Sequence, residues 1–306
     1  LPIWWLRLSR NLIGQAVSFA KEHNSGASAM GFVVKDAVFA YQEALKRGGK
    51  AAPERSGSMP DDVPAIIGIG GSLLYFVDSP DKYMKDFTFT SQDKNPNGCG
   101  LTYIDHLTHN LKRGNMAVWA KFYEDIFNFR EIRYFDIEGK LTGLKSKAMT
   151  SPCGKIRIPL NESSDDKSQI EEFLSRFKGE GIQHIAMGTD DIYQTVRDLN
   201  KKGVPLQDTP DTYYEGVEKR IPGHGEDLAE LKKLRILIDG APGDQGLLLQ
   251  IFTQDAIGPV FFEIIQRKGN EGFGEGNFKA LFESIELDQI RRGVLKDDGK
   301  RAVSAN

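Results

Sequence analysis

The stretch GIQHIAMGTDDIYQTVRDLNKKG at 181–203 decides how this chain folds, because it joins a strand pattern to a helix pattern. Apolar residues dominate its first part, and two aspartates stand where a helix would begin. Ile192, Val196 and Leu199 then recur at the spacing of one helix face, and Gly203 closes the pattern. Aspartate is a preferred helix N-cap, and glycine is common just past a helix C-terminus. The stretch therefore predicts a strand, a capped helix and a turn.

The same plan occurs at 29–49 and again from residue 103, where the helix is predicted over Met116–Phe127. Aligning the three strands places Met30, His106 and His184 at one equivalent position, at intervals of about 77 residues, which indicates one supersecondary unit used several times. Short apolar runs follow each strand–helix pair, so each unit is predicted to hold one strand, one helix and about three further strands. This pattern predicts an α+β fold class of repeated βαβββ units.

Polar, turn-rich residues at 79–100 separate the first repeat from the other two and predict a linker. We therefore expect an N-terminal domain over 1–90 and a larger domain over 100–306. The N-terminal domain is expected to be incomplete at its start, because the sequence has no initiator methionine and its first residues lack a signal-peptide cleavage site.

Composition excludes several classes of protein. The chain has 306 residues, with 40 basic and 43 acidic side chains and a net charge of −3, which argues against a nucleic-acid partner. No apolar run is long enough to predict a membrane span. Two cysteines are too few for a disulfide scaffold and suit a reducing compartment. We expect a cytoplasmic enzyme or binding protein.

Two of the five histidines gain significance from the repeat. His106 and His184 occupy equivalent strand positions, so stacking two units would bring both imidazoles onto one concave surface. Glu263 lies within the apolar run 260–265, where a buried carboxylate would need a cation, a metal or a raised pKa. The alternation of that run also allows Glu263 to face solvent on an edge strand.

Two histidines and one carboxylate form the facial triad of non-heme Fe(II) oxygenases. Zinc, nickel and manganese accept the same ligand types, so the donor set alone leaves the metal open. The N-terminal repeat carries Met30 at the histidine position and Tyr75 at the carboxylate position. That repeat is therefore predicted to bind no metal and to serve the scaffold or assembly.

Six sequence blocks together resemble the 4-hydroxyphenylpyruvate dioxygenase family, most closely its bacterial members. The blocks lie at 143–149, 154–162, 181–186, 248–252, 262–267 and 272–278. The resemblance covers essentially residues 14–296. It implies the vicinal-oxygen-chelate fold, in which βαβββ units form open-barrel domains, here a metal-free N-terminal domain and a catalytic domain.

The resemblance places the metal ligands on His106, His184 and Glu263 and implies one Fe(II) per subunit. It implies oxidation of 4-hydroxyphenylpyruvate by O2 to homogentisate and CO2, a step of tyrosine and phenylalanine catabolism. The polar catalytic residues that it implies are Ser146, Asn161, Gln169, Gln183 and Gln250. The substrate-binding residues that it implies are Phe252, Phe261, Phe273, Asn277 and Phe278. A final helix predicted over 277–295 resembles the family's gate.

Three other functions stay open at this point. 4-Hydroxymandelate synthase resembles this family in fold, metal and substrate but oxidises the benzylic carbon. An extradiol ring-cleaving dioxygenase would share the ligands, and a metal-free binding protein would share only the fold. The expected partners are a small-molecule substrate, O2 and further copies of the chain in a dimer or tetramer, with no nucleic acid and no membrane.

Overall fold

The computed structural model describes residues 14–53, 63–79, 88, 98–138, 143–166, 168–241 and 246–291. The start of the N-terminal domain and most of the predicted linker lie outside these residues. The chain forms two compact units. The first takes its described residues from Leu1–Asn97, Tyr103–Ala186 and Asp255–Phe262, and the second from Gly98–Thr102, Met187–Gln254 and Glu263–Asn306.

A three-stranded sheet in the order β1-β3-β2 contains the first predicted repeat. Its segment comprises α1 (Gln15–His23), β1 (Ala29–Val33), α2 (Ala37–Lys46), β2 (Ala65–Ile67), η1 (Ile69–Gly71) and β3 (Leu73–Val77). The Asp36 carboxylate caps α2 by accepting a hydrogen bond from Phe39 N at 2.9 Å. Met30 and Tyr75 are both buried, on strands that pair in parallel. The strand and helix predicted at 29–49 are confirmed.

Two complete βαβββ units follow, which confirms the predicted α+β fold class. The first consists of β4 (Leu101–Leu111), α4 (Met116–Phe127), β5 (Arg130–Glu138), β6 (Gly143–Thr150) and β7 (Arg157–Ser163). The second consists of β8 (Gly181–Thr189), α6 (Ile192–Lys201), β9 (Leu237–Ala241), β10 (Gly246–Phe252) and β11 (Phe261–Lys268). Helices that the sequence patterns did not predict are α5 (Gln169–Phe177), α7 (Asp211–Glu215), α8 (Val217–Arg220) and α9 (Leu228–Leu234).

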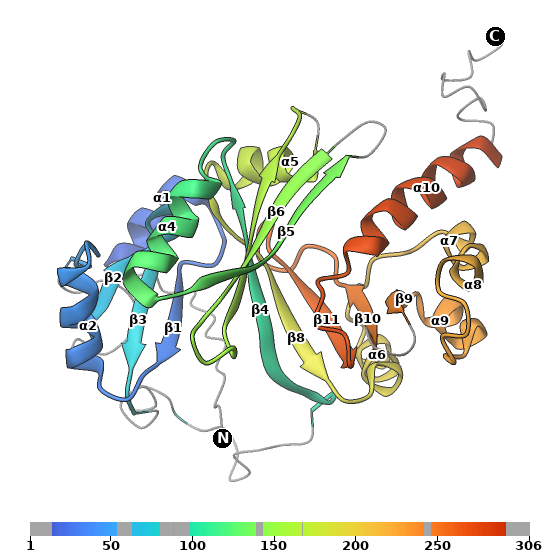
Figure 1. The fold of residues 1–306 in the computed structure, drawn as a ribbon, viewed down its shortest axis with the longest axis horizontal. Coiled ribbons are helices and arrows are strands. Elements are labelled where there is room, and N and C mark those ends of the chain that lie inside the picture. Colours follow the sequence, from blue (N-terminus) through green and yellow to red (C-terminus); the bar gives the residue numbers. More distant parts are fainter. Residues whose placement is uncertain are drawn as a thin grey trace. The chain divides into compact units, whose positions relative to one another are not determined.

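The two βαβββ units form one eight-stranded sheet with the order β5-β6-β7-β4-β8-β11-β10-β9. Each unit therefore contributes its strands in mirrored order, with its last strand beside its first. The first strands, β4 and β8, lie side by side in the middle of the sheet (Figure 1). This order is the reason that equivalent positions on β4 and β8 become neighbours.

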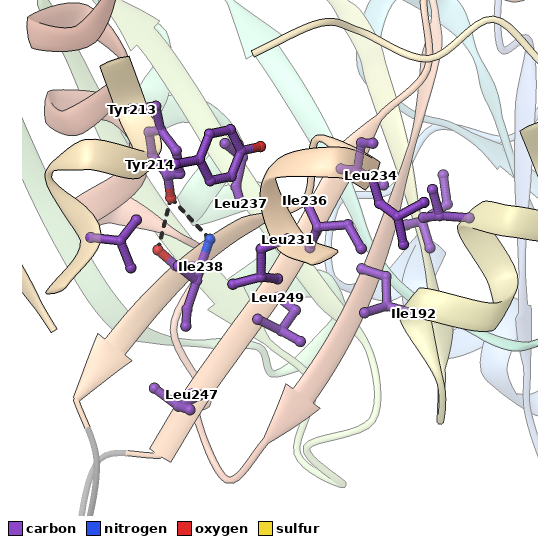
Figure 2. Packing of buried hydrophobic residues seen from close by; sticks show 14 of the residues in the cluster. Ile192, Tyr213, Tyr214, Leu231, Leu234, Ile236, Leu237, Ile238, Leu247 and Leu249 are labelled. Atoms are coloured by element: carbon purple, nitrogen blue, oxygen red, sulfur yellow. Dashed lines mark hydrogen bonds between the residues drawn. The ribbon is translucent and has the colours of Figure 1, made fainter. Parts of the chain in front are cut away.

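A cluster of buried aliphatic and tyrosine side chains supports β9 and β10 (Figure 2). Tyr213 is its polar centre. The Tyr213 hydroxyl accepts hydrogen bonds from Ile238 N at 2.9 Å and from Arg220 Nη2 at 2.8 Å. Burial raises the pKa of Tyr213 to about 12, so the hydroxyl keeps its proton at neutral pH.

The final helix, α10 (Glu275–Arg291), begins two residues earlier than predicted, and residues 292–295 of the prediction lie outside the described residues. Polar contacts attach it to α7 and β9. Gly276 N donates to Asp239 Oδ2 at 2.8 Å, Thr212 Oγ1 donates to Ser284 O at 2.7 Å, and Arg291 forms a bidentate ion pair with Glu215. Among the described helices, none has the length and apolar character needed to cross a bilayer.

A buried histidine joins β4 to α4. His109 Nε2 lies 2.7 Å from the Tyr123 hydroxyl, and both side chains are fully buried. Burial disfavours the charged imidazolium and lowers the pKa of His109 to about 3. His109 is therefore neutral in the folded protein throughout the physiological range.

We expect this histidine to make stability fall as the solution is acidified. Below pH 6.5 the unfolded chain protonates His109 and the folded chain does not, so the free energy of unfolding decreases toward low pH. Between pH 6.5 and pH 5 the loss from this group is about 2 kcal/mol. Ring resonances of His109, assigned by comparison with His109→Gln, should not titrate between pH 7.5 and pH 5. A midpoint near 6.5 would contradict the prediction.

Candidate metal centre

Three strands bring the predicted ligands together. His106 lies on β4, His184 on β8 and Glu263 on β11, and one potential ligand atom from each lies within 4.8 Å of the other two. His106 and Glu263 are buried, and His184 is half-buried. The sheet order explains the grouping, since β4, β8 and β11 are consecutive strands. The three side chains could hold a metal ion.

The donor set fits a divalent metal. Two imidazole nitrogens and one carboxylate oxygen match the facial arrangement that non-heme Fe(II) uses. Glu263 is only 3% exposed, and burying a carboxylate costs free energy that a bound cation would offset. The solvent-facing alternative for Glu263 is therefore wrong, because this side chain is buried.

Each histidine of this group contacts the side chain that precedes it. His106 Nδ1 lies 2.8 Å from Asp105 Oδ1, and His184 Nδ1 lies 3.0 Å from Gln183 Oε1. Phe261 stacks on the His184 ring, with centroids 5.0 Å apart and planes at 20°. Gln183 and Phe261, both predicted as pocket residues, thus lie against one of the candidate ligands.

Two further predicted residues are cross-strand neighbours. Ser146 on β6 pairs in register with Asn161 on β7, so their side chains share one face of the sheet. Asn161 in turn pairs with Asn110 on β4. Among the described residues, Asn161 Oδ1 and both amide atoms of Asn110 are buried without a hydrogen-bond partner. Such atoms are rare in native proteins and commonly face a ligand or an ordered water.

Asn110 was missed by the sequence patterns. It stands four residues after His106, and the two-residue period of a strand places both on one face. That spacing was available in the sequence. Its burial and its missing partner became evident only from the structure.

Gln250 on β10 is buried next to a glycine with left-handed backbone. Among the described residues, Gln250 Oε1 has no hydrogen-bond partner. Gly274 adopts φ +75°, and a Cβ there would lie 2.2 Å from Gln250 Oε1. Glycine at 274 therefore leaves the space in which the Gln250 amide lies.

Asn277 lies in the first turn of α10 and is held by the tyrosine of the nearby core. Its Oδ1 accepts a hydrogen bond from the Tyr213 hydroxyl at 2.6 Å. Its Nδ2 is buried and has no partner among the described residues. Asn277 therefore has a fixed orientation with one donor left for another group.

The remaining predicted residues lie as follows. Phe252 pairs in register with Glu263 on β11, so the two side chains share a face of that strand pair. The Arg267 guanidinium lies over the Phe273 ring, with its Cζ 5.6 Å from the ring centroid. Phe278 is half-buried on α10, and Gln169 is exposed at the start of α5. The roles of these four residues stay predictions.

Two family models match the chain. Residues 6–94 match the N-terminal hydroxyphenylpyruvate dioxygenase (HPPD) model, and residues 103–221 match the glyoxalase/bleomycin resistance protein/dioxygenase superfamily model.

Similar proteins point to the same family. Hemolysin VllY of Vibrio vulnificus is 64% identical over 289 residues, covering 92% of this chain and 81% of the relative. The 4-hydroxyphenylpyruvate dioxygenase of Pseudomonas aeruginosa is 62% identical over 286 residues, covering 92% of this chain and 80% of that relative.

A solved triple mutant of 4-hydroxymandelate synthase from Streptomyces coelicolor superimposes with a TM-score of 0.75 at 26% identity, covering 90% of this chain and 80% of that chain. The identity to the 4-hydroxyphenylpyruvate dioxygenase of Pseudomonas aeruginosa, 62%, is more than twice as high. The chain belongs to the 4-hydroxyphenylpyruvate dioxygenase family, within the glyoxalase/bleomycin resistance protein/dioxygenase superfamily.

Proposed function

We propose that this protein is an Fe(II)-dependent dioxygenase that converts 4-hydroxyphenylpyruvate and O2 to homogentisate and CO2. One observation carries the proposal: His106, His184 and Glu263 form a metal-binding group in a chain 62% identical to a protein named for this reaction. The atoms balance. The substrate carboxylate leaves as CO2, one oxygen atom of O2 enters the new carboxylate, and the other becomes a hydroxyl on the ring carbon that bore the side chain. The side chain breaks its bond to that carbon and migrates to the neighbouring one, whose hydrogen is lost as a proton while the new oxygen gains a proton.

The metal and the protein would have different tasks in this reaction. Fe(II) on three protein ligands would leave open positions for the two oxygens of a 2-oxo acid and for O2, and so would supply the oxidation chemistry. The protein's own tasks are to orient the ring and to exclude water. Because the substrate is itself a 2-oxo acid, no second oxo-acid co-substrate is needed.

Buried amides are suited to orient the substrate. The acceptor oxygens of Asn161 and Gln250 are buried without partners among the described residues, so either one could accept the single hydrogen bond that the phenol hydroxyl of the substrate donates. We assign Ser146, which pairs in register with Asn161, to the same polar set. Gln169, exposed at the start of α5, is assigned to the polar set on the family resemblance alone. Gln183 already contacts His184, and we assign it to the ligand and the substrate together.

Aromatic side chains are suited to line the ring site. Phe261 stacks on His184, and Phe252 lies beside Glu263 in register. We assign Phe252, Phe261, Phe273 and Phe278 to this lining, where aromatic faces would contact the substrate ring and exclude water. Asn277 would offer its remaining donor from the start of α10, the helix to which we assign gating.

We extend the proposal to organisation and location. Domains at 1–90 and 100–306 are supported by family matches that end at residue 94 and begin at residue 103. The buried Met30 and Tyr75 support a metal-free N-terminal domain. We infer a homo-oligomer, a dimer or a tetramer, and a cytoplasmic enzyme whose cysteines, Cys99 and Cys153, are both free.

The reaction product tests the function. Apoprotein reconstituted with Fe(II) under anaerobic conditions, mixed with 4-hydroxyphenylpyruvate and then exposed to air, should form homogentisate in step with O2 consumption. Mass spectrometry and NMR identify the aromatic product. Protein reconstituted with Zn(II) is the matched control, because zinc accepts the same ligands and has no redox chemistry.

The other outcomes separate the alternatives. 4-Hydroxymandelate as the product would replace the proposed reaction by that of 4-hydroxymandelate synthase, whose solved structure this fold resembles. Absence of O2 consumption from protein with bound iron would overturn the dioxygenase assignment for this substrate.

A further inference from the structure

We propose that Asp105 is a positioning residue for metal binding: clamped by Arg157, it holds His106 in the tautomer that presents Nε2 to the ion. This inference rests on the metal-dependent function proposed above. It concerns a side chain that neither the sequence patterns nor the family resemblance singled out.

The geometry at His106 determines which ring nitrogen carries the proton. Asp105 is 2% exposed, and its Oδ1 lies 2.8 Å from His106 Nδ1. An ionised carboxylate can only accept a hydrogen bond, so Nδ1 must be the donor. The lone pair of the neutral ring then lies on Nε2. Metal-bound histidines in proteins generally donate their other N–H to such a partner.

A second contact orients Asp105 itself. Arg157, on β7, places Nη1 3.4 Å from Asp105 Oδ2, while Oδ1 faces the imidazole. The two carboxylate oxygens therefore have separate partners. This arrangement offsets part of the cost of burying the carboxylate and restricts its rotation.

The repeated unit provides an internal comparison. Gln183 occupies the position before His184 that Asp105 occupies before His106, and its Oε1 contacts His184 Nδ1 at 3.0 Å. Both histidines thus contact an acceptor from the preceding residue, but only Asp105 is an anion. A carboxylate increases the basicity of its histidine more than an amide does.

The test measures metal affinity rather than turnover alone. Apoproteins of the parent, Asp105→Asn and Asp105→Leu are titrated with Co(II) against a chromogenic chelator, and the visible spectrum of bound Co(II) is recorded. We expect Kd to rise about 100-fold in Asp105→Leu and about 10-fold in Asp105→Asn, which keeps an acceptor oxygen but loses the charge. The Co(II) spectrum should change in both variants.

Glu162→Gln is the matched control. Glu162 is another largely buried carboxylate of the same unit, but its Oε2 accepts from Met116 N at 3.0 Å, at the start of α4. This variant should lose stability and keep the parental Co(II) affinity and spectrum. Thermal unfolding of each apoprotein separates loss of fold from loss of Co(II) affinity. If Asp105→Leu does not fold, the isosteric Asp105→Asn alone tests the inference.

The outcomes distinguish this inference from the proposed function. If the parent binds one Co(II) and both Asp105 variants bind it with parental affinity, Asp105 has only a structural role and the inference is wrong. An equal loss of affinity in Glu162→Gln would also overturn it, because the effect would then follow general destabilisation. A parent that binds no Co(II) would overturn the proposed metal-dependent function, and the inference with it.

Discussion

Glu263→Gln is expected to lower Fe(II) affinity and the rate of homogentisate formation by more than about a hundredfold. Mutating a residue that only supports a metal ligand already lowers metal affinity or activity about ten- to a hundredfold. Glu263 is the single carboxylate of the metal-binding group. Glutamine has almost the same size but no negative charge, so the two histidines would be left as neutral ligands. Iron content after anaerobic reconstitution and gel filtration, together with O2 consumption, measures the effect.

The same loss is expected for His106→Ala and His184→Ala, each of which removes one donor from the group. Glu162→Gln again serves as control, because Glu162 caps the start of α4. Its iron content should equal that of the parent. Full iron binding and turnover in Glu263→Gln or His106→Ala would show that the metal lies elsewhere.

Gly181→Ala is expected to destabilise the protein by about 1–3 kcal/mol, the usual cost of overpacking a well-filled core. Gly181 begins β8, and a Cβ there would lie 2.3 Å from Phe177 Cε1. The ring has no room to move, because it is fully buried and stacks on His23 at 4.6 Å and on Phe173 at 5.0 Å between centroids. Equilibrium urea unfolding measures the change.

A double variant tests the reason for this loss. Phe177→Leu shortens the side chain that the new Cβ would meet, so Gly181→Ala should cost less in that background than alone. Gly216→Ala is the control, since a Cβ there would meet only Tyr213 O at 3.7 Å. We expect its stability to stay within about 0.5 kcal/mol of the parent. Equal costs in both backgrounds would contradict the steric explanation.

Local sequence patterns predicted the first strand and the helix of each unit well. The helix predicted over Met116–Phe127 has those limits in the structure. Asp36 and Asp191 cap their helices as the patterns indicated, through hydrogen bonds to Phe39 N and Gln194 N. These features depend on contacts within a few residues, which is why sequence periodicity detects them.

Other elements have weaker local signals. Arg130–Glu138 forms the edge strand β5 and is rich in charged residues, so it lacks the apolar run that predicts a strand. The short helices α7 and α8 are buried through Tyr213, Tyr214 and Val217, and their sequence shows no sustained helical period. Their conformation depends on packing against distant residues, which a local window does not contain.

The sequence by itself determined the repeat and the equivalence of His106 with His184, and it identified His106, His184 and Glu263 as candidate metal donors. It could not determine which face of β11 carries Glu263 into the interior, because alternation shows two faces without showing which is buried. The tertiary structure decided this by packing the face of β11 that carries Glu263 into the interior, where this side chain is 3% exposed. It also decided that Asp105 and Gln183 contact the ring nitrogens of the histidines. Strand neighbours and side-chain partners of this kind are set by long-range packing, whereas the strands and helices themselves are set largely by local sequence.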